Sequence, residues 1–227
     1  MRYPVCLESD TTGQSRSHVQ GLPGCWATGR EPGDALEGLF VAIPEYWAWL
    51  GRHGLPVAPP DGLGEVTLAV VEIVRDHPPG ASPLFTYEQA PVTPAFVVSC
   101  LRRLTYSRSD LLGALAGLPV ATFVPGPEGT VGGLVMHLAA TERRLTRLLG
   151  PGSRLKPAAD PLARLANMRA SAIHQITQLP DTPGDHIVSR GGESWNLRKV
   201  LRRLIEHERE HTAEIVALRG QEVPQAS

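Results

Sequence analysis

The sequence predicts an α+β N-terminal domain, consisting of a small antiparallel sheet with one helix, followed by an all-α four-helix bundle. Three observations support this fold class. Short β-branched or alternating segments surround one helical pattern in the first third of the chain. Four segments with helical spacing of apolar residues follow residue 92. A proline-rich stretch lies between them at residues 75–91, and its prolines disfavour an internal helix.

Charge is distributed unevenly along the chain. Residues 1–90 carry 5 basic and 11 acidic residues, and residues 91–227 carry the other 17 and 12. Such a shift between halves supports two domains. The expected boundaries are residues 1–74 for the first domain, 75–91 for a linker, 92–219 for the bundle and 220–227 for a tail.

The overall composition excludes several classes of protein. Hydrophobic residues make up 42% of the 227 residues and charged residues 20%, as is ordinary for a globular protein. No apolar run approaches the roughly 20 residues that span a bilayer, and the N-terminus does not resemble a signal peptide. Cys6, Cys25 and Cys100 are too few and too scattered for a disulfide framework. We therefore expect a cytoplasmic protein without membrane contact, and the charge argues against nucleic-acid binding.

The first domain reads as three strands, a helix and a further strand. Strands are expected at residues 3–7, 17–21, 25–29 and 64–74, separated by turns rich in glycine and proline. The helix begins after residue 31 and ends before the glycines at 51 and 54. Its apolar positions have helical spacing: Leu36, Leu39, Phe40, Ile43, Trp47 and Leu50.

The turn and helix start of this domain resemble the HicB-type antitoxin domain. The matching residues are Leu22, Pro23, Gly24, Cys25, Gly29, Asp34 and Ala35. The resemblance implies a toxin-like protein partner for the N-terminal domain. HicB-type antitoxins commonly carry a DNA-binding segment after this domain, whereas here a helical bundle follows. A structural α+β domain without a site of its own is the alternative interpretation.

Four helices are expected in the second domain. They cover residues 95–118, 130–149, 160–179 and 195–216. Thr130 is a favoured N-cap, and Asp160 is followed by a proline in the first turn. Ser194 or Asn196 caps the last helix. Helices of this length and amphipathicity are typical of a bundle.

The last helix carries His207 and His211, which are four residues apart and therefore lie one turn apart on one face. Their register places His211 in an apolar stripe and His207 at its edge. Buried imidazoles need polar partners, and one metal ion would satisfy both. Alternatively, the segment is a charge-rich surface, with Glu206, Arg209 and Glu210 facing outward.

The second helix supplies a third histidine. His137 shares a helical face with apolar residues such as Leu134 and Leu138, so we expect it to point into the same core. Three neutral imidazoles from two facing helices form an open site for Zn²⁺ or another divalent transition metal such as Ni²⁺. The other five histidines lie off such faces or in turns and are interpreted as solvated.

These histidines resemble the pattern of the DinB family of four-helix bundles. Members carry Leu-x-His-Leu-Ala-x-x-Glu in the second helix and His-Glu-x-x-His in the fourth. The corresponding residues are Leu134 or Val135, His137, Leu138, Ala139 and Glu142, then His207, Glu208 and His211. The resemblance covers residues 92–219 and implies that His137, His207 and His211 bind the metal. Where members often continue Arg-Gly-Gln-Ile, this chain has Glu214, which either accepts a hydrogen bond behind a ligand or is solvated.

Related families with this site include thiol-dependent transferases and isomerases, in which the metal activates a low-molecular-weight thiol. Water activation for hydrolysis is a second option. Glu208 is the candidate general base, or it accepts a hydrogen bond from an imidazole. We therefore expect a metal-dependent transferase or hydrolase acting on a small molecule. The alternative is a non-catalytic metal-binding or sensor protein whose first domain binds a partner. A homodimer is expected, because apolar residues such as Val216 lie outside the helical stripes.

Overall fold

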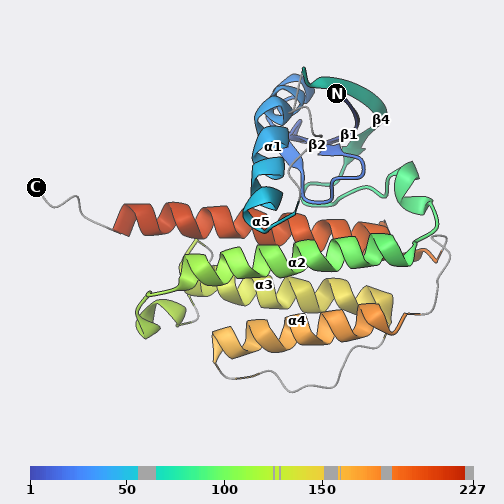
Figure 1. Cartoon of the computed structure of the whole chain (residues 1–227). Coiled ribbons are helices and arrows are strands. Elements are labelled where there is room, and N and C mark those ends of the chain that lie inside the picture. The colour runs from blue at the N-terminus through green and yellow to red at the C-terminus, as the bar shows by residue number, and fades with distance from the viewer. Residues whose placement is uncertain are drawn as a thin grey trace, which may run out of the picture. The chain divides into compact units, whose positions relative to one another are not determined.

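Figure 1 shows a computed structural model, which describes residues 1–55, 65–124, 126–127, 129–150, 158, 160–179 and 186–222. The chain divides into two compact units. The first unit contains Met1–Ala90 and Gly184–Arg202, and the second contains Pro91–Pro183 and Arg203–Ser227. Within the described residues, no helix is long and apolar enough to cross a membrane. Part of the predicted tail, residues 223–227, lies outside the described residues.

The first unit contains a four-stranded mixed sheet. Its strands are β1 (Arg2–Asp10), β2 (Ser15–Val19), β3 (Trp26–Gly29) and β4 (Thr67–His77), in the order β3-β2-β1-β4. The order of elements along the chain was predicted, but the all-antiparallel sheet was wrong, because β4 is parallel to β1. The helix between β3 and β4 returns the chain across the sheet. The strand that follows therefore runs in the same direction as β1 and adds beside it.

Helix α1 (Pro32–Arg52) packs on this sheet, with Leu39, Ile43, Tyr46 and Leu50 buried. Hydrogen bonds fix its position, since the Tyr46 hydroxyl donates to the carbonyl of Pro23 at 2.9 Å. The predicted buried face was partly wrong. Phe40 was predicted to be buried but is 48% exposed. Trp49 was not part of the predicted face but is only 2% exposed.

The first unit extends beyond residue 74. Strand β4 continues to His77, and the segment that follows contains a 3-10 turn, η1 (Thr86–Gln89), but no α-helix. The Glu88 side chain is fully buried and lies 2.7 Å from the guanidinium of Arg202. The short strands β5 (Val188–Arg190) and β6 (Glu193–Trp195) pair with each other in the same unit. Residues 75–90 of the predicted linker therefore contain no α-helix and belong to the first unit.

Four further helices form the helical unit. They are α2 (Pro94–Leu115), α3 (Val131–Thr146), α4 (Pro161–Thr177) and α5 (Leu197–Glu222), with 3-10 turns η2 (Val120–Phe123) and η3 (Arg147–Leu149). The predicted caps are confirmed: Thr130 accepts from Gly133 N at 3.1 Å, Asp160 from Ala163 N at 2.6 Å, and Asn196 from Lys199 N at 3.0 Å.

The chain is not strictly a four-helix bundle, because the described residues contain five α-helices. Helix α1 belongs to the first unit, and the first turns of α5 up to Arg202 also belong there. The apolar core of the second unit joins all four of its helices, including Leu111 of α2, Leu138 of α3, Leu165 of α4 and Ile215 of α5. The sequence could not reveal this division of α5, since its helical pattern continues without a break across residue 202.

The close approach at Gly29 gives a test of the first unit. An alanine Cβ at Gly29 would lie 2.5 Å from Ala35 N and would also collide with the Asp34 side chain. Overpacking of this kind costs about 1–3 kcal/mol. We expect Gly29→Ala to lower the free energy of unfolding by about 2 kcal/mol, measured by urea unfolding with tryptophan fluorescence. All four tryptophans lie in the first unit.

Gly33→Ala is the matched control for this substitution. A Cβ at Gly33 meets only Glu31 Oε1, at 3.9 Å, and alanine favours the helix. Equal stability of the Gly29→Ala protein and the parent would contradict the packing of α1 against the end of β3.

Candidate metal centre

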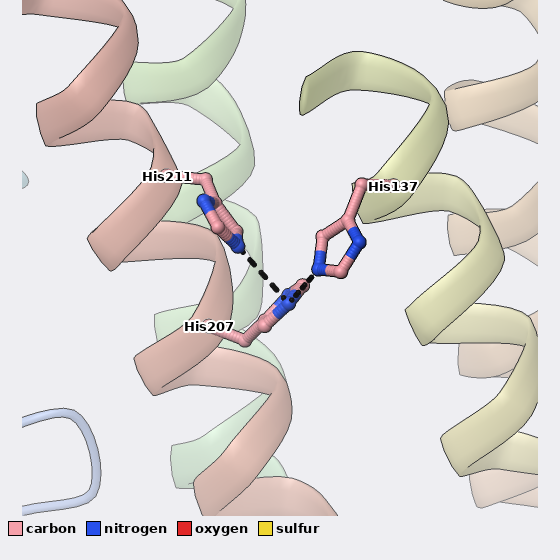
Figure 2. Close-up of side chains that lie close together, drawn as sticks. All are labelled: His137, His207 and His211. Carbon is pink, nitrogen blue, oxygen red and sulfur yellow. Dashed lines mark hydrogen bonds between the residues drawn. The ribbon is translucent and has the colours of Figure 1, made fainter. Parts of the chain in front are cut away.

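Three histidines from two helices converge in the helical unit (Figure 2). His137 projects from α3, and His207 and His211 project from α5. The Nε2 atom of His207 lies 2.9 Å from Nε2 of His137 and 3.2 Å from Nε2 of His211. A ligand atom from each ring lies within 4.8 Å of the others. The structure therefore brings together the three residues that the sequence singled out, here called the histidine triad.

The histidine triad lies at the edge of the helical unit, not in its apolar core. His137 is exposed, and His207 and His211 are half-buried. The prediction that His137 points into the core was wrong. The buried face of α3 is centred on Val131, Val135 and Leu138, which leaves His137 at its margin. The site is consequently open to solvent on the α3 side.

Burial and charge keep His207 neutral. Burial, followed by the neighbouring His211 and His137, lowers the pKa of His207 to about 2. Among the described residues, three Nε2 atoms face one another. A neutral imidazole donates through only one nitrogen, so hydrogen bonds between the rings cannot satisfy all three lone pairs. One cation bound by the three nitrogens would satisfy them together, so this donor set fits a metal.

Glu214 orients one of the candidate ligands. Its carboxylate Oε2 lies 2.9 Å from Nδ1 of His211. Donation from Nδ1–H to the carboxylate leaves the Nε2 lone pair of His211 directed at the other two rings. Of the two roles considered for Glu214, the hydrogen-bonding role is the one observed.

Glu208 lies next to His207 in sequence but faces a different group. Its Oε1 lies 2.5 Å from Nε of Arg108, and its Oε2 lies 2.8 Å from Nη2 of Arg169. The Ser107 hydroxyl also donates to Oε2. The carboxylate that the sequence offered as a general base is thus held by two guanidinium groups, and among the described residues it forms no hydrogen bond or ion pair with the histidine triad.

These contacts belong to a closed ring of four charges, here called the Arg–Glu network. Arg108 of α2 and Arg169 of α4 each contact both Glu142 of α3 and Glu208 of α5. The Glu142 contacts measure 2.7 Å to Arg108 and 2.5 Å to Arg169. All four residues are less than 10% exposed. One residue from each helix of the second unit therefore contributes to a neutral buried network.

The third nitrogen of each guanidinium group also has an acceptor. Arg108 Nη1 donates to the carbonyl of Leu165 at 2.7 Å, and Arg169 Nη1 donates to the carbonyl of Leu104. Burial alone would raise the pKa of Glu208, but the charges of Arg169 and Arg108 outweigh it and hold the pKa below its ordinary value. Glu208 is consequently charged at neutral pH.

The sequence contained a signal for these arginines that our prediction did not use. Arg108 lies four residues after Leu104 and three before Leu111, and Arg169 lies four after Leu165. A charged residue at a stripe position is rarely buried without a partner. The alternative interpretation placed Glu206 on the outward face of the last helix. Glu206 is only 1% exposed, so it does not face outward. The segment around the histidines is therefore not a simple charge-rich surface.

Comparison with protein families identifies the helical part. Residues 103–215 match the family model of the DinB superfamily, so the chain contains a DinB-superfamily domain there. This match confirms the resemblance predicted for the C-terminal region. The chain matches none of the curated proteins and none of the solved structures. None of these findings identifies a HicB-type domain in the N-terminal region.

Removing one member of the Arg–Glu network should strongly destabilise the helical unit. Arg108→Met leaves two buried carboxylates with one guanidinium, and removing one partner of a buried charge group costs about 3–5 kcal/mol. We expect a loss of that size in the free energy of unfolding, measured by circular dichroism in urea. Arg102→Met is the matched control, because Arg102 is exposed on the same helix. It should change stability by less than about 0.5 kcal/mol. Similar losses in both proteins would refute the role of the network.

The low pKa of His207 predicts how the metal-free protein responds to acid. In the unfolded chain a histidine gains a proton near pH 6.5, whereas folded His207 gains it only near pH 2. The unfolded state therefore binds more protons in this window, and stability falls as pH drops below 6.5. We expect His207→Gln to flatten this fall between pH 6.5 and 4.5, measured by thermal unfolding with chelator present. His174→Gln, at an exposed position, should retain it. An unchanged slope in His207→Gln would contradict the assignment.

Proposed function

We propose that the DinB-superfamily domain binds one divalent transition-metal ion through His137, His207 and His211. We further propose that the protein is a metal-dependent transferase or hydrolase that acts on a small molecule, with a low-molecular-weight thiol as the favoured co-substrate. Zn²⁺ is the favoured ion and Ni²⁺ the alternative, since imidazole suits both. The observation that carries this proposal is the convergence of three Nε2 atoms from α3 and α5.

Several features support a reactive centre over a purely structural one. Structural zinc sites are normally closed by four protein ligands, whereas catalytic sites keep a position free. Three protein ligands are available here among the described residues, and His137 is exposed, so a small molecule can reach the site. Such an ion supplies Lewis acidity, which lowers the pKa of a thiol or water that binds to it.

Within this proposal, the protein side chains near the ion position it and do not transfer protons. Glu214 orients His211 through Nδ1. Glu208 fixes the rotation of α5 through Arg108 and Arg169, and these contacts argue against the role of general base. The attacking group would instead lose its proton on binding the ion, which suits a thiol better than water because a thiol is the stronger acid.

The first unit receives no catalytic role in this proposal. The toxin-like partner rested on the HicB resemblance and stays a prediction, as does the homodimer. A non-catalytic metal-binding or sensor role differs from the proposed function in one measurable respect: it requires no exchangeable ligand on the ion.

Removal of one ligand tests the proposed metal site. His211→Ala should abolish stoichiometric binding of Zn²⁺, measured by isothermal titration calorimetry and elemental analysis, because two imidazoles hold the ion far more weakly than three. The helical circular dichroism should stay largely intact, since His211 is half-buried and outside the apolar core.

His174→Ala is the control for this experiment, because His174 is an exposed histidine of the same unit. It should bind Zn²⁺ as the parent does. Stoichiometric binding by His211→Ala with the affinity of the parent would overturn the proposed site.

A further inference from the structure

Two arginines lie on the same helical faces as the histidine triad. Arg203 precedes His207 by four residues on α5, which is one turn. Arg144 follows His137 by seven residues on α3, which is two turns on the same face. Positive charge therefore lies on both helical faces that carry the histidine triad.

The two arginines differ in whether they form an ion pair with another residue. Arg203 Nη1 lies 3.1 Å from Oε2 of the buried Glu206, which neutralises part of its charge. Arg144 is exposed and makes no hydrogen bond or ion pair with any part of the chain that the structure describes. Helical side chains lean toward the N-terminus of their helix. Arg144 therefore leans toward His137, whereas Arg203 leans away from His207.

The opposite side of the triad carries negative charge. Glu214 contacts Nδ1 of His211 through a carboxylate whose side chain is 49% exposed. A negatively charged ligand group would be repelled there and attracted toward Arg144. The site thus has a direction, from the acidic side at Glu214 to the basic side at Arg144.

We propose that Arg144 forms an anion subsite beside the histidine triad. The ligand of this site is a small molecule with a metal-binding sulfur or oxygen atom at one end. A carboxylate or phosphate group lies a few bonds away from that atom. The guanidinium group presents paired N–H donors that match both anionic groups. This inference rests on the proposed function, because it assigns the chemistry of the ligand that the ion would bind.

The test uses the full-length protein loaded with Co²⁺, whose visible absorption reports thiolate binding. Two probes with the same carbon skeleton are compared at constant ionic strength: 3-mercaptopropionate and its neutral amide, 3-mercaptopropionamide. The parent protein should bind the carboxylate about fivefold more tightly than the amide, a size expected of a charge-assisted contact at an exposed site. Arg144→Gln should lose most of that preference, and Arg144→Lys should retain part of it.

Arg143→Gln is the matched control. Arg143 is the adjacent exposed arginine, and it faces about 100° away from Arg144 on the helix. Arg143→Gln removes the same charge from a different face of the helix. It should therefore keep the preference of the parent for the carboxylate. If the Co²⁺-loaded parent binds both probes equally, or if Arg144→Gln retains the full preference, the anion subsite is refuted while the metal site stands. If the parent binds no Co²⁺, the proposed function fails and this inference fails with it.

Discussion

The closed Arg–Glu network is the constraint on which the arrangement of the helical unit depends. Each carboxylate of Glu142 and Glu208 is shared between Arg108 and Arg169, so the four helices cannot rotate independently without breaking an ion pair. Neighbouring side chains on a helix point about 100° apart. Holding Glu208 inward therefore directs the adjacent His207 toward the edge of the unit. The geometry of the histidine triad follows from a contact that involves none of its members.

The network specifies the arrangement more than it adds net stability. Moving four charges out of water is costly, and their mutual attraction offsets that cost only when the geometry is good and other donors are satisfied. Here two guanidinium donors reach the carbonyls of Leu165 and Leu104, and the charges sum to zero. Alternative rotations of the helices would leave a buried charge unpaired. Apolar side chains alone would tolerate such rotations more readily, since dispersion contacts are not directional.

Patterns within single segments predicted the fold well, and relations between segments were predicted poorly. Helix caps at Thr130 and Asp160 depend on local chemistry, so the sequence was sufficient for them. The parallel pairing of β4 with β1 depends on which edge of the sheet the chain reaches after α1. The exposure of His137 likewise depends on how far α3 is rotated about its axis, and partners on other helices set that rotation. A spacing rule cannot supply this information, because it describes each helix alone.

Each of the two short DinB motifs therefore places a candidate metal ligand on one face of its helix and a member of the Arg–Glu network on another. In α3, His137 faces the candidate metal centre while Glu142, five residues later, faces the Arg–Glu network. In α5, His207 and Glu208 make the same division between adjacent residues. The glutamates form the buried ion pairs that hold the helices together. The histidines are not needed for that packing, so they can lie at an exposed edge. An edge position allows a small molecule to approach without opening the apolar core. That separation explains how rigid placement and open access coexist in one pair of helices.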